Sequence, residues 1–340
     1  MRILIVRLGA LGDIVHALPA LAALRRTFPD ARIDWLVDAR HRAVLDLVSG
    51  LTSVVVVETM RRWSRLPSAV RGLRAARYEI AIDLQGLLKS AVLARASGAD
   101  RVLGFERRAL REPLASMFYS EQHAVDDQGH VIRKNLALAH AAGAAPGPMT
   151  FPFVVPPLPA GVEPPYVLIN PGAGWPNKQW PPERFGALAA WIRERHGLRS
   201  IVAWGPREEA LAAAVVSQSQ GAALAAPRTS IGDLLAIAKA ARLVVSGDTG
   251  PMHLGAAVGT PLVGLFGPTN PARNGPFDPA DESVNRFGGC VCHHERRCRR
   301  ETACITTITL DEVQGAVERR LARITDERPT PNAQVPKAGA

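Results

Sequence analysis

The sequence lacks the features that would make it a membrane-spanning, secreted or nucleic-acid-binding protein. No apolar run reaches the about 18–20 residues that a membrane-spanning helix needs. The first residues enter a strand pattern at once, without the apolar core and cleavage site of a signal peptide, so we expect a cytoplasmic chain. Aromatic residues make up 5%, and no RNA- or DNA-binding motif is present, so we expect no nucleic-acid partner.

Lysine is also scarce, yet the chain is strongly basic. Its net charge is +10, carried by 36 Arg and only 5 Lys, against 31 acidic residues. Residues 1–155 have a net charge of +7 and residues 156–340 a net charge of +3. The Arg bias alone has a plain explanation in genome composition. Its uneven distribution favours an anionic partner for the first half, such as a phosphorylated lipid or the cytoplasmic leaflet of a membrane.

The hydrophobic pattern predicts an α/β protein with two Rossmann-like parallel-sheet domains that face a central cleft. Strand-like runs alternate with helical runs twice along the chain, which is typical of parallel sheets with right-handed crossovers. Between the two series, residues 146–165 hold eight prolines, which neither a helix nor a central strand tolerates. We therefore expect the following divisions: a domain over 1–150, a Pro-rich linker over 151–165, a domain over 166–325 and a flexible tail over 326–340.

The expected strands number five in each domain. In the first they cover 2–7, 33–37, 54–57, 80–83 and 101–103, and in the second 166–170, 200–204, 222–225, 242–246 and 261–265. Ligands of such sheets bind at the carboxyl ends of the strands, so the loops there are the first candidates for chemistry.

The loop after the first strand has the pattern G-x-x-G-D. Gly9 and Gly12 permit a tight turn with close approach of another molecule, and Asp13 falls at the start of the following helix. Helix capping is one interpretation of Asp13. The other is a proton acceptor for a substrate hydroxyl, because a carboxylate at this place would repel a nucleotide pyrophosphate.

Two loops of the second domain are candidates for phosphate binding. Residues 170–181 form a glycine-rich loop after a strand, and Lys178 lies just before a helix. Residues 244–257 run from a strand through Asp248, Thr249 and Gly250 into another helix, with His253 in its first turn. Backbone N–H groups at a helix N-terminus suit a pyrophosphate. An ordinary surface lysine and a structural histidine are the plainer interpretations.

With these loops in view, the chain resembles glycosyltransferase family 9, the ADP-heptose transferases of lipopolysaccharide core assembly. The motif D-T-G-x-x-H-L-x-A-A, then G-P-T-x-P, and the early G-D carry the resemblance. Residues 60–63, 84–91 and 111–119 are similar to the subgroup that adds the first heptose to Kdo-lipid A. The resemblance extends from residue 1 to about residue 325 and implies a GT-B fold, an inverting reaction and no cofactor for catalysis.

The resemblance also implies roles for individual residues and partners. Asp13 is then the general base, and the donor, ADP-heptose, is bound by Lys178, Glu208, Thr229, Asp248, Thr249, Gly250 and His253. Glu208 matches a residue that binds the ribose hydroxyls, and Thr229 falls where the adenine is contacted. Kdo-lipid A at the cytoplasmic face of the inner membrane is the implied acceptor. Its binding residues are then Gly12, Arg61, Arg62, Lys89 and Arg111.

The cysteines depart from the pattern of the first-heptose subgroup. All four lie within fifteen residues, as Cys290, Cys292, Cys298 and Cys304, in the spacing C-x-C-x5-C-x5-C. Disulfides are rare in the cytoplasm. A structural metal ion is one interpretation, although C-x-C is tight for two ligands of one tetrahedral ion. Packed, reduced thiols are the other.

Other functions remain as alternatives. The cysteine stretch is more similar to the wider family, so a second-heptose or another ADP-heptose transferase with a different acceptor stays open. A nicotinamide-dependent oxidoreductase needs a G-x-G-x-x-G turn, which neither half supplies. A non-catalytic nucleotide-sugar binding module needs no base at Asp13 and no paired domains.

Overall fold

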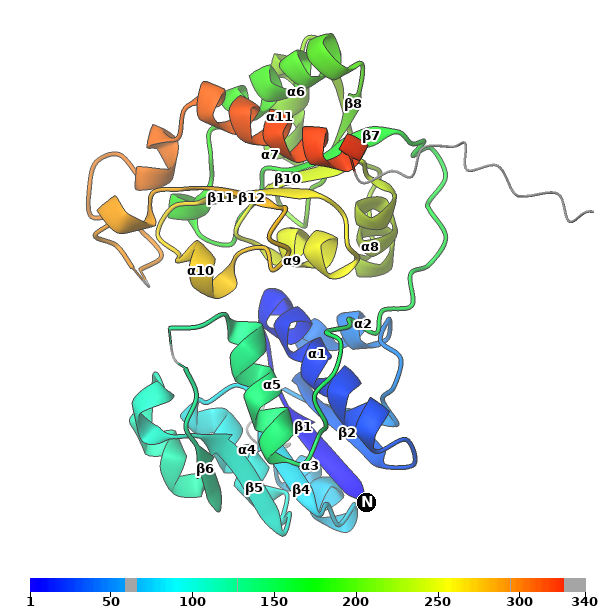
Figure 1. The fold of residues 1–340 in the computed structure, drawn as a ribbon, viewed down its shortest axis with the longest axis vertical. Coiled ribbons are helices and arrows are strands. Elements are labelled where there is room, and N and C mark those ends of the chain that lie inside the picture. The colour runs from blue at the N-terminus through cyan, green and yellow to red at the C-terminus, as the bar shows by residue number, and fades with distance from the viewer. Residues whose placement is uncertain (59–65, 127, 294, 327–340) are drawn as a thin grey trace, which may run out of the picture.

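The computed structural model describes residues 1–58, 66–126, 128–293 and 295–326. It contains two α/β domains, stacked one above the other in Figure 1, and each has its own parallel six-stranded sheet. Arg61 and Arg62 lie outside the described residues, so their predicted role is not tested by the structure. The predicted fold class, two Rossmann-like domains, is confirmed.

The first sheet has the strand order β3-β2-β1-β4-β5-β6, with all pairs parallel. Its central strands are almost wholly apolar and buried, because helices cover both faces of a sheet of this kind. Its strands are β1 (Arg2–Val6), β2 (Arg32–Asp38), β3 (Ser53–Val57), β4 (Ile80–Asp83), β5 (Arg101–Phe105) and β6 (Glu121–His123).

The second sheet repeats this topology, in the order β12-β11-β10-β7-β8-β9. In each sheet the strand order reverses beside the first strand, between β1 and β4 and between β7 and β10. Ligands of doubly wound sheets bind at this reversal, outside the carboxyl ends of the strands. Its strands are β7 (Tyr166–Asn170), β8 (Arg199–Val202), β9 (Ala223–Ala225), β10 (Leu243–Gly247), β11 (Leu262–Phe266) and β12 (Glu282–Asn285).

The helices connect the strands and cover the sheets. The α-helices of the first domain are α1 (Leu11–Thr27), α2 (Arg42–Leu45), α3 (Leu66–Ala75), α4 (Leu88–Ala96) and α5 (Val131–Ala141). Those of the second are α6 (Pro182–His196), α7 (Glu209–Gln218), α8 (Ile231–Ala240), α9 (Gly250–Ala257), α10 (Pro271–Asn274) and α11 (Leu310–Asp326). Short 3-10 helices are η1 (Ala39–His41), η3 (Arg107–Ala109), η4 (Pro113–Phe118), η5 (Pro176–Lys178), η6 (Phe287–Gly289) and η7 (Cys304–Thr307).

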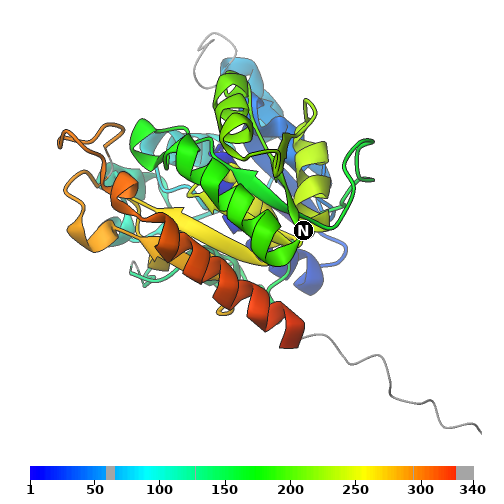
Figure 2. The same cartoon turned by 90° about the horizontal axis from the view of Figure 1, so that it is seen from above.

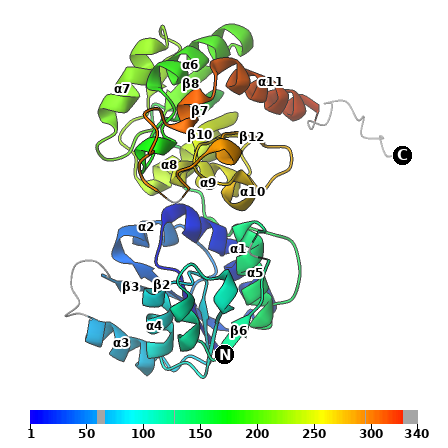
Figure 3. The same cartoon turned by 90° about the vertical axis from the view of Figure 1, so that its left-hand side faces the viewer.

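Helices of the two domains meet at the domain boundary. α1 packs against α9, and their ends face each other between the two sheets in Figure 1. On the far side of the second sheet, α6 and α11 lie next to each other, as the view from above in Figure 2 shows. Figure 3 shows the same two bodies from the side, with α2 near α8. The boundary therefore brings the N-termini of α1 and α9 together.

Two details differ from the sequence-based prediction. Each sheet has a sixth strand that the pattern did not reveal, β6 and β12, and both are short edge strands of mostly polar, partly exposed residues. α1 begins at Leu11, two residues before Asp13, which the sequence places at its start, because the extended residue Ala10 is its N-cap. The Pro-rich segment 146–165 contains no helix, and its one β contact is an isolated bridge between Phe153 and Val48. Among the described residues, no helix has both the length and the apolar character to cross a bilayer.

Candidate active site

The loop between β1 and α1 holds the predicted base. The carboxylate of Asp13 lies 2.8 Å from the guanidinium of Arg7, and its other oxygen accepts the backbone N–H of Ala10 at 3.1 Å. Asp13 is thus the third helical residue and not the cap itself, which is Ala10. Its side chain is 44% exposed. The carboxylate stabilises the first turn of α1 and still faces solvent on the side of the cleft, so the structure accommodates both interpretations of Asp13.

Gly9 and Gly12 each allow a histidine ring to lie against the backbone. A Cβ atom on Gly9 would overlap the ring of His41, and one on Gly12 would overlap the ring of His253. The space beside Gly12, which the sequence assigns to the acceptor, is therefore occupied by a side chain of the second domain. Gly250 has the reciprocal contact, because a Cβ atom there would overlap Leu11. The glycines of the two loops let the two domains touch.

His41 belongs to the surroundings of Asp13, although the sequence analysis did not identify it. It ends η1 beyond the carboxyl end of β2, next to β1. Burial lowers the pKa of His41, Arg40 and Lys89 lower it further, and Asp38 and Asp13 act in the opposite direction. A neutral imidazole near the predicted base, within the electrostatic reach of Lys89, can both donate and accept a hydrogen bond. The place of His41 beside Asp13 follows only from the pairing of β1 with β2.

The donor-side residues form a buried, charged cluster at the reversal point of the second sheet. Lys178 Nζ lies 2.6 Å from one oxygen of Asp248, and His253 Nε2 lies 3.3 Å from the other. Asp248 is 6% exposed. Burial alone would raise the pKa of its carboxyl, but His253 and Lys178 outweigh burial and hold that pKa well below its usual range. The structure thus brings together Lys178 from one predicted loop and Asp248 and His253 from the other, because β7 and β10 are neighbours.

Asn170, the last residue of β7, holds the turn before α9 in place by hydrogen bonds. Asn170 Nδ2 donates to Thr249 Oγ1 at 2.9 Å and to Ser246 Oγ at 3.0 Å. The hydroxyl of Thr249, the N-cap residue, therefore does not cap α9. The first turn of this helix receives no acceptor from its own N-cap, and its positive end faces the cleft next to Lys178. This is the arrangement that binds phosphate groups.

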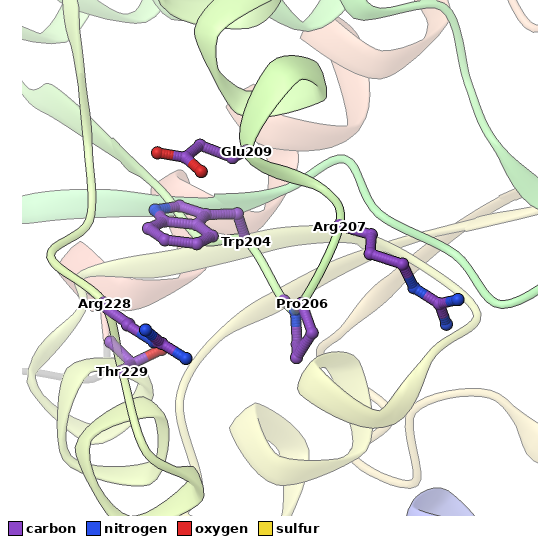
Figure 4. Close-up of a pocket in the computed structure, with 7 residues that line it drawn as sticks. Trp204, Pro206, Arg207, Glu209, Arg228 and Thr229 are labelled. Atoms are coloured by element: carbon purple, nitrogen blue, oxygen red, sulfur yellow. The ribbon is translucent and has the colours of Figure 1, made fainter.

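A cavity of about 560 Å³ lies at the carboxyl end of β8. Trp204 and Arg207 line it from one loop, and Arg228 and Thr229 line it from the loop after β9, as Figure 4 shows. Arg207 has a left-handed backbone (φ 74°), an uncommon and strained conformation for a non-glycine residue. Of the cavity residues, only Thr229 was predicted from the sequence; Trp204, Arg207 and Arg228 were missed.

Glu208 lies at the edge of this cavity, between two glycines. Its carboxylate accepts the backbone N–H of Gly205 at 2.9 Å, and a Cβ atom on Gly172 would overlap it. One carboxylate oxygen is therefore engaged by the protein. The position between the loops after β7 and β8 suits the predicted contact with ribose hydroxyls, which stays a prediction.

A row of histidines connects the donor cluster to the first domain. The ring of His16, in α1, lies edge-on to His253 with 4.3 Å between centroids, and His130 lies 5.4 Å from His16 on its other side. Burial lowers the pKa of His16 well below its usual value, and His253, His130 and Arg7 add to this, so its imidazole is neutral. His130 Nε2 lies 3.0 Å from the carbonyl oxygen of Gly275 in the second domain. The sequence analysis identified neither His16 nor His130.

The described acceptor-side cations lie on two elements that pack together. Lys89 is in the first turn of α4, and Arg111 precedes η4; both side chains are exposed. The backbone N–H of Leu88 donates to Glu112 Oε2 at 2.7 Å and connects the two elements. Both follow carboxyl ends of strands, α4 after β4 and η4 after β5, so they lie at the edge that also carries Asp13.

The four cysteines gather into one cluster. Cys290, Cys292 and Cys304 are buried, and the Sγ atoms of Cys292 and Cys298 are 3.0 Å apart. All four are free thiols, and no group of three or more His, Cys, Asp or Glu among the described residues is arranged to hold a metal ion. The structural-metal interpretation therefore has no support from the structure. The cysteine loop is far from Lys178 in the sequence, but the fold brings the two together. Asn177, next to Lys178, donates to the carbonyl of Glu295 at 2.9 Å.

Two facing Rossmann-like domains, with a carboxylate at the cleft edge of one and a Lys–Asp–His cluster at the helix N-terminus of the other, define a glycosyltransferase of the GT-B fold. A family model described as glycosyltransferase family 9 (heptosyltransferase) matches residues 67–303. The chain belongs to this family and is a heptosyltransferase-class enzyme.

Individual relatives agree with this assignment. The chain is 33% identical over 313 residues to lipopolysaccharide heptosyltransferase 1 of Pseudomonas aeruginosa, covering 88% of this chain and 87% of that protein. It is 28% identical over 295 residues to the protein of the same name from Escherichia coli K12, covering 82% and 91% of the two chains. The structure of E. coli heptosyltransferase WaaC with ADP-2-deoxy-2-fluoro heptose is similar with a TM-score of 0.76 at 26% identity, covering 94% of this chain and 99% of that one.

Proposed function

We propose that this enzyme transfers L-glycero-D-manno-heptose from ADP-heptose to the Kdo residue of Kdo-lipid A, in assembly of the lipopolysaccharide inner core. The observation that carries the proposal is the contact between Gly12 and His253. Through it, the loop that carries Asp13 lies against His253, which pairs with Asp248 in the cluster of Lys178, Asp248 and His253. The names of the relatives support the choice of heptose and of the first-heptose acceptor.

The donor fits the second domain by charge and by shape. The cavity beside Trp204 has room for the nucleoside, with Thr229 near the adenine and Glu208 near the ribose hydroxyls. The diphosphate then reaches the N-terminus of α9 and Lys178. In this proposal Asp248 holds Lys178 and His253 in place, so the ammonium group is already positioned when the diphosphate arrives.

The reaction is a single displacement with inversion at the anomeric carbon. The acceptor hydroxyl oxygen forms a bond to this carbon, and its proton passes to the carboxylate of Asp13. The bond from the carbon to the diphosphate oxygen breaks, and its electron pair leaves with ADP. Lys178 and the dipole of α9 stabilise the negative charge that develops on the leaving group, so no metal ion takes part in the step as proposed.

The acceptor is proposed to bind at the basic edge of the first sheet. Lys89 and Arg111, with Arg61 and Arg62 outside the described residues, offer charge-assisted contacts to its phosphate and carboxylate groups. The enzyme would reach this lipid-linked acceptor from the cytoplasm, by peripheral association with the inner membrane.

The test is ADP release from ADP-heptose with two acceptors, Kdo-lipid A and the same molecule already carrying one heptose. We expect turnover with Kdo-lipid A, together with a product heavier by one heptose. Faster turnover of the heptosylated acceptor would overturn the proposal in favour of a second-heptose transferase. Binding of ADP without turnover of either acceptor would favour a non-catalytic binding module.

A further inference from the structure

Four large apolar side chains are exposed together on two adjacent elements of the first domain. Leu88 and Val92 lie on α4, and Leu114 and Met117 lie on η4, which packs against α4. Leu114 is 58% exposed and Met117 75% exposed. We refer to these four residues as the α4–η4 surface.

The helical periods place these side chains in pairs. Leu88 and Val92 are four residues apart on an α-helix, and Leu114 and Met117 are three apart on a 3-10 helix, so each pair shares a face. The four make up nearly half of the ten exposed large apolar side chains among the described residues, and the other six are spread over both domains. Single exposed apolar residues are ordinary, whereas a contiguous group points to an interaction.

The core does not require these residues. Within η4, Ala115 is fully buried and Ser116 is 5% exposed, and they attach the 3-10 helix to the domain. The hydroxyl of Ser116 donates to the carbonyl of Pro113 at 2.8 Å, which closes the turn. Leu114 and Met117 are directed outward from the same short segment. Their exposure therefore has no explanation in the packing of η4.

Exposed cations lie on or beside the elements that form the α4–η4 surface. Lys89, Arg107, Arg108 and Arg111 are exposed, and within the part of the chain that the structure describes none of them forms an ion pair with an acidic side chain. Nearby Arg101, in contrast, is paired with Glu121 at 2.6 Å. Apolar groups with a rim of free cations match the boundary between the acyl chains and the headgroups of an anionic bilayer.

The α4–η4 surface also lies at the functional end of its domain. α4 begins five residues after β4, and η4 follows β5, so both are at the carboxyl edge of the first sheet, where Asp13 follows β1. A partner with a flat surface that contacts this edge would bring the molecules anchored in that surface close to Asp13.

We propose that the α4–η4 surface docks the enzyme on the anionic leaflet of a phospholipid bilayer, with Leu114 and Met117 inserted between the headgroups. This deepens the proposed function and rests on it in one respect, that the acceptor is anchored in a lipid bilayer. Docking is distinct from acceptor recognition: it concentrates the enzyme at the surface and orients the cleft toward it.

The test is sedimentation of the full chain with vesicles, without either substrate. We expect binding to phosphatidylglycerol–phosphatidylethanolamine vesicles, weaker binding to phosphatidylcholine vesicles, and release by salt. The double variant Leu114→Asp/Met117→Asp should bind about tenfold more weakly or worse, because it removes apolar insertion and adds negative charge. The matched control is Leu224→Asp, at a 51% exposed position on the edge strand β9 of the other domain. It should bind like the wild type.

Thermal melts establish that the variants fold, which we expect because all three positions are exposed. A second variant, Arg107→Gln/Arg108→Gln, retains the apolar groups and should weaken the salt dependence. Equal vesicle binding by the wild type and the Leu114→Asp/Met117→Asp protein, or no binding of the wild type to anionic vesicles, would overturn the proposal. The first result would indicate that the surface serves a protein partner instead.

Activity measurements keep this proposal separate from the proposed function. The Leu114→Asp/Met117→Asp enzyme should turn over an O-deacylated, water-soluble Kdo acceptor like the wild type, and should be slower only with acceptor embedded in vesicles. Loss of turnover on the soluble acceptor would mean that the two residues belong to the acceptor site and that docking is the wrong assignment. A wild-type enzyme that binds vesicles but transfers no heptose to either acceptor would contradict the proposed function and leave docking intact.

Discussion

The two sides of the cleft are built in different ways. On the donor side, Asp248 is buried and already paired with Lys178 and His253. On the acceptor side, Asp13 is half exposed, and the described cations Lys89 and Arg111 are exposed and form no ion pair with an acidic side chain among the described residues. The proposed function accounts for this difference, because a small nucleotide sugar suits a preformed, buried site and a large lipid-linked acceptor needs an open surface. Variants on the two sides should therefore fail differently, on the donor side by loss of stability and on the acceptor side by loss of rate or acceptor affinity.

The sharpest test of this contrast is Asp13→Asn. Asparagine retains the shape and can still accept the N–H of Ala10, but it cannot take a proton. Loss of a general base typically lowers the rate by about 10²–10⁴-fold, so kcat should fall by that order. ADP affinity and melting temperature should stay close to those of the wild type. Steady-state kinetics with thermal melts decide the matter: an early melt with most of kcat retained would make Asp13 a residue of the first helical turn and nothing more.

The donor-side counterpart is Asp248→Asn, which should damage stability as well as activity. It leaves the largely buried ammonium group of Lys178 without its counter-charge, and breaking a buried ion pair typically costs about 3–5 kcal/mol. We expect a lower unfolding free energy in urea and weaker ADP binding. Asp233→Asn, at a partly exposed capping position on α8, is the control and should lose much less stability. If the two variants were equally stable, the preformed character of the donor side would be wrong.

The same carboxylate predicts a pH dependence. The folded pKa of Asp248 is depressed, so its stabilisation is complete above the unfolded pKa of about 3.9 and is lost as pH falls through the lower folded value. Between neutral pH and about pH 5, this group should leave the unfolding free energy unchanged. Below about pH 4 the wild type should lose stability faster than Asp248→Asn, which has no carboxyl to titrate. Parallel pH curves for the two proteins would contradict the assignment.

The sequence predicts those parts of the fold and of the candidate site that depend on local pattern, and it misses those that depend on contacts between distant segments. Eight of the ten predicted strands are interior strands of the two sheets, and these are readable because buried parallel strands are continuous apolar runs. The edge strands β6 and β12 are short and mostly polar, and each forms by pairing with a single neighbouring strand. Their local sequence pattern therefore does not predict them. Lys178 and Asp248 are each recognisable in their own loops, and their meeting follows from the adjacency of β7 and β10.

The residues that sequence analysis missed are those defined by the other domain or by a neighbouring loop. His16 is one turn beyond Asp13 on α1 and matters only because α9 brings His253 against it. His41 matters only because Gly9 leaves room for its ring. A lone histidine after a strand or within a helix gives no local indication of such contacts. Contacts of this kind follow from the strand order and from the packing of the two domains against each other. Hydrophobic periodicity in the sequence predicts neither.

On the proposed acceptor side, Arg111→Ala should raise the KM for the acceptor by about 10- to 100-fold, since a charge-assisted hydrogen bond is typically worth about 1.5–3 kcal/mol. The KM for ADP-heptose and the melting temperature should not change, because the side chain is exposed and has no ion-pair partner among the described residues. Arg95→Ala, exposed in the last turn of α4, is the matched control. An unchanged acceptor KM in alanine variants of Arg111, Lys89, Arg61 and Arg62 alike would make the basic edge a solvated or merely membrane-attracted face.

The smallest effect on activity is expected at the cysteine cluster. This variant tests whether the cluster is part of the proposed donor site. Changing Cys290, Cys292, Cys298 and Cys304 together to Ser should lower the melting temperature, because three of the four thiols are buried. The KM for the donor should change by less than about twofold, since Asp248 and not the cysteine loop pairs with Lys178.

Asn177→Ala is the matched comparison, because it removes the hydrogen bond from Asn177 to Glu295 through which the cysteine loop contacts the lysine loop. If Asn177→Ala and the cysteine variant raise the donor KM by the same factor, the cluster positions Lys178 and belongs to the donor site. If only the melting temperature falls, the cluster is a structural element alone. Metal analysis of protein purified without chelators separates a third case, because a stoichiometric ion would mean that the thiols act as ligands and that the loss of stability is loss of the ion.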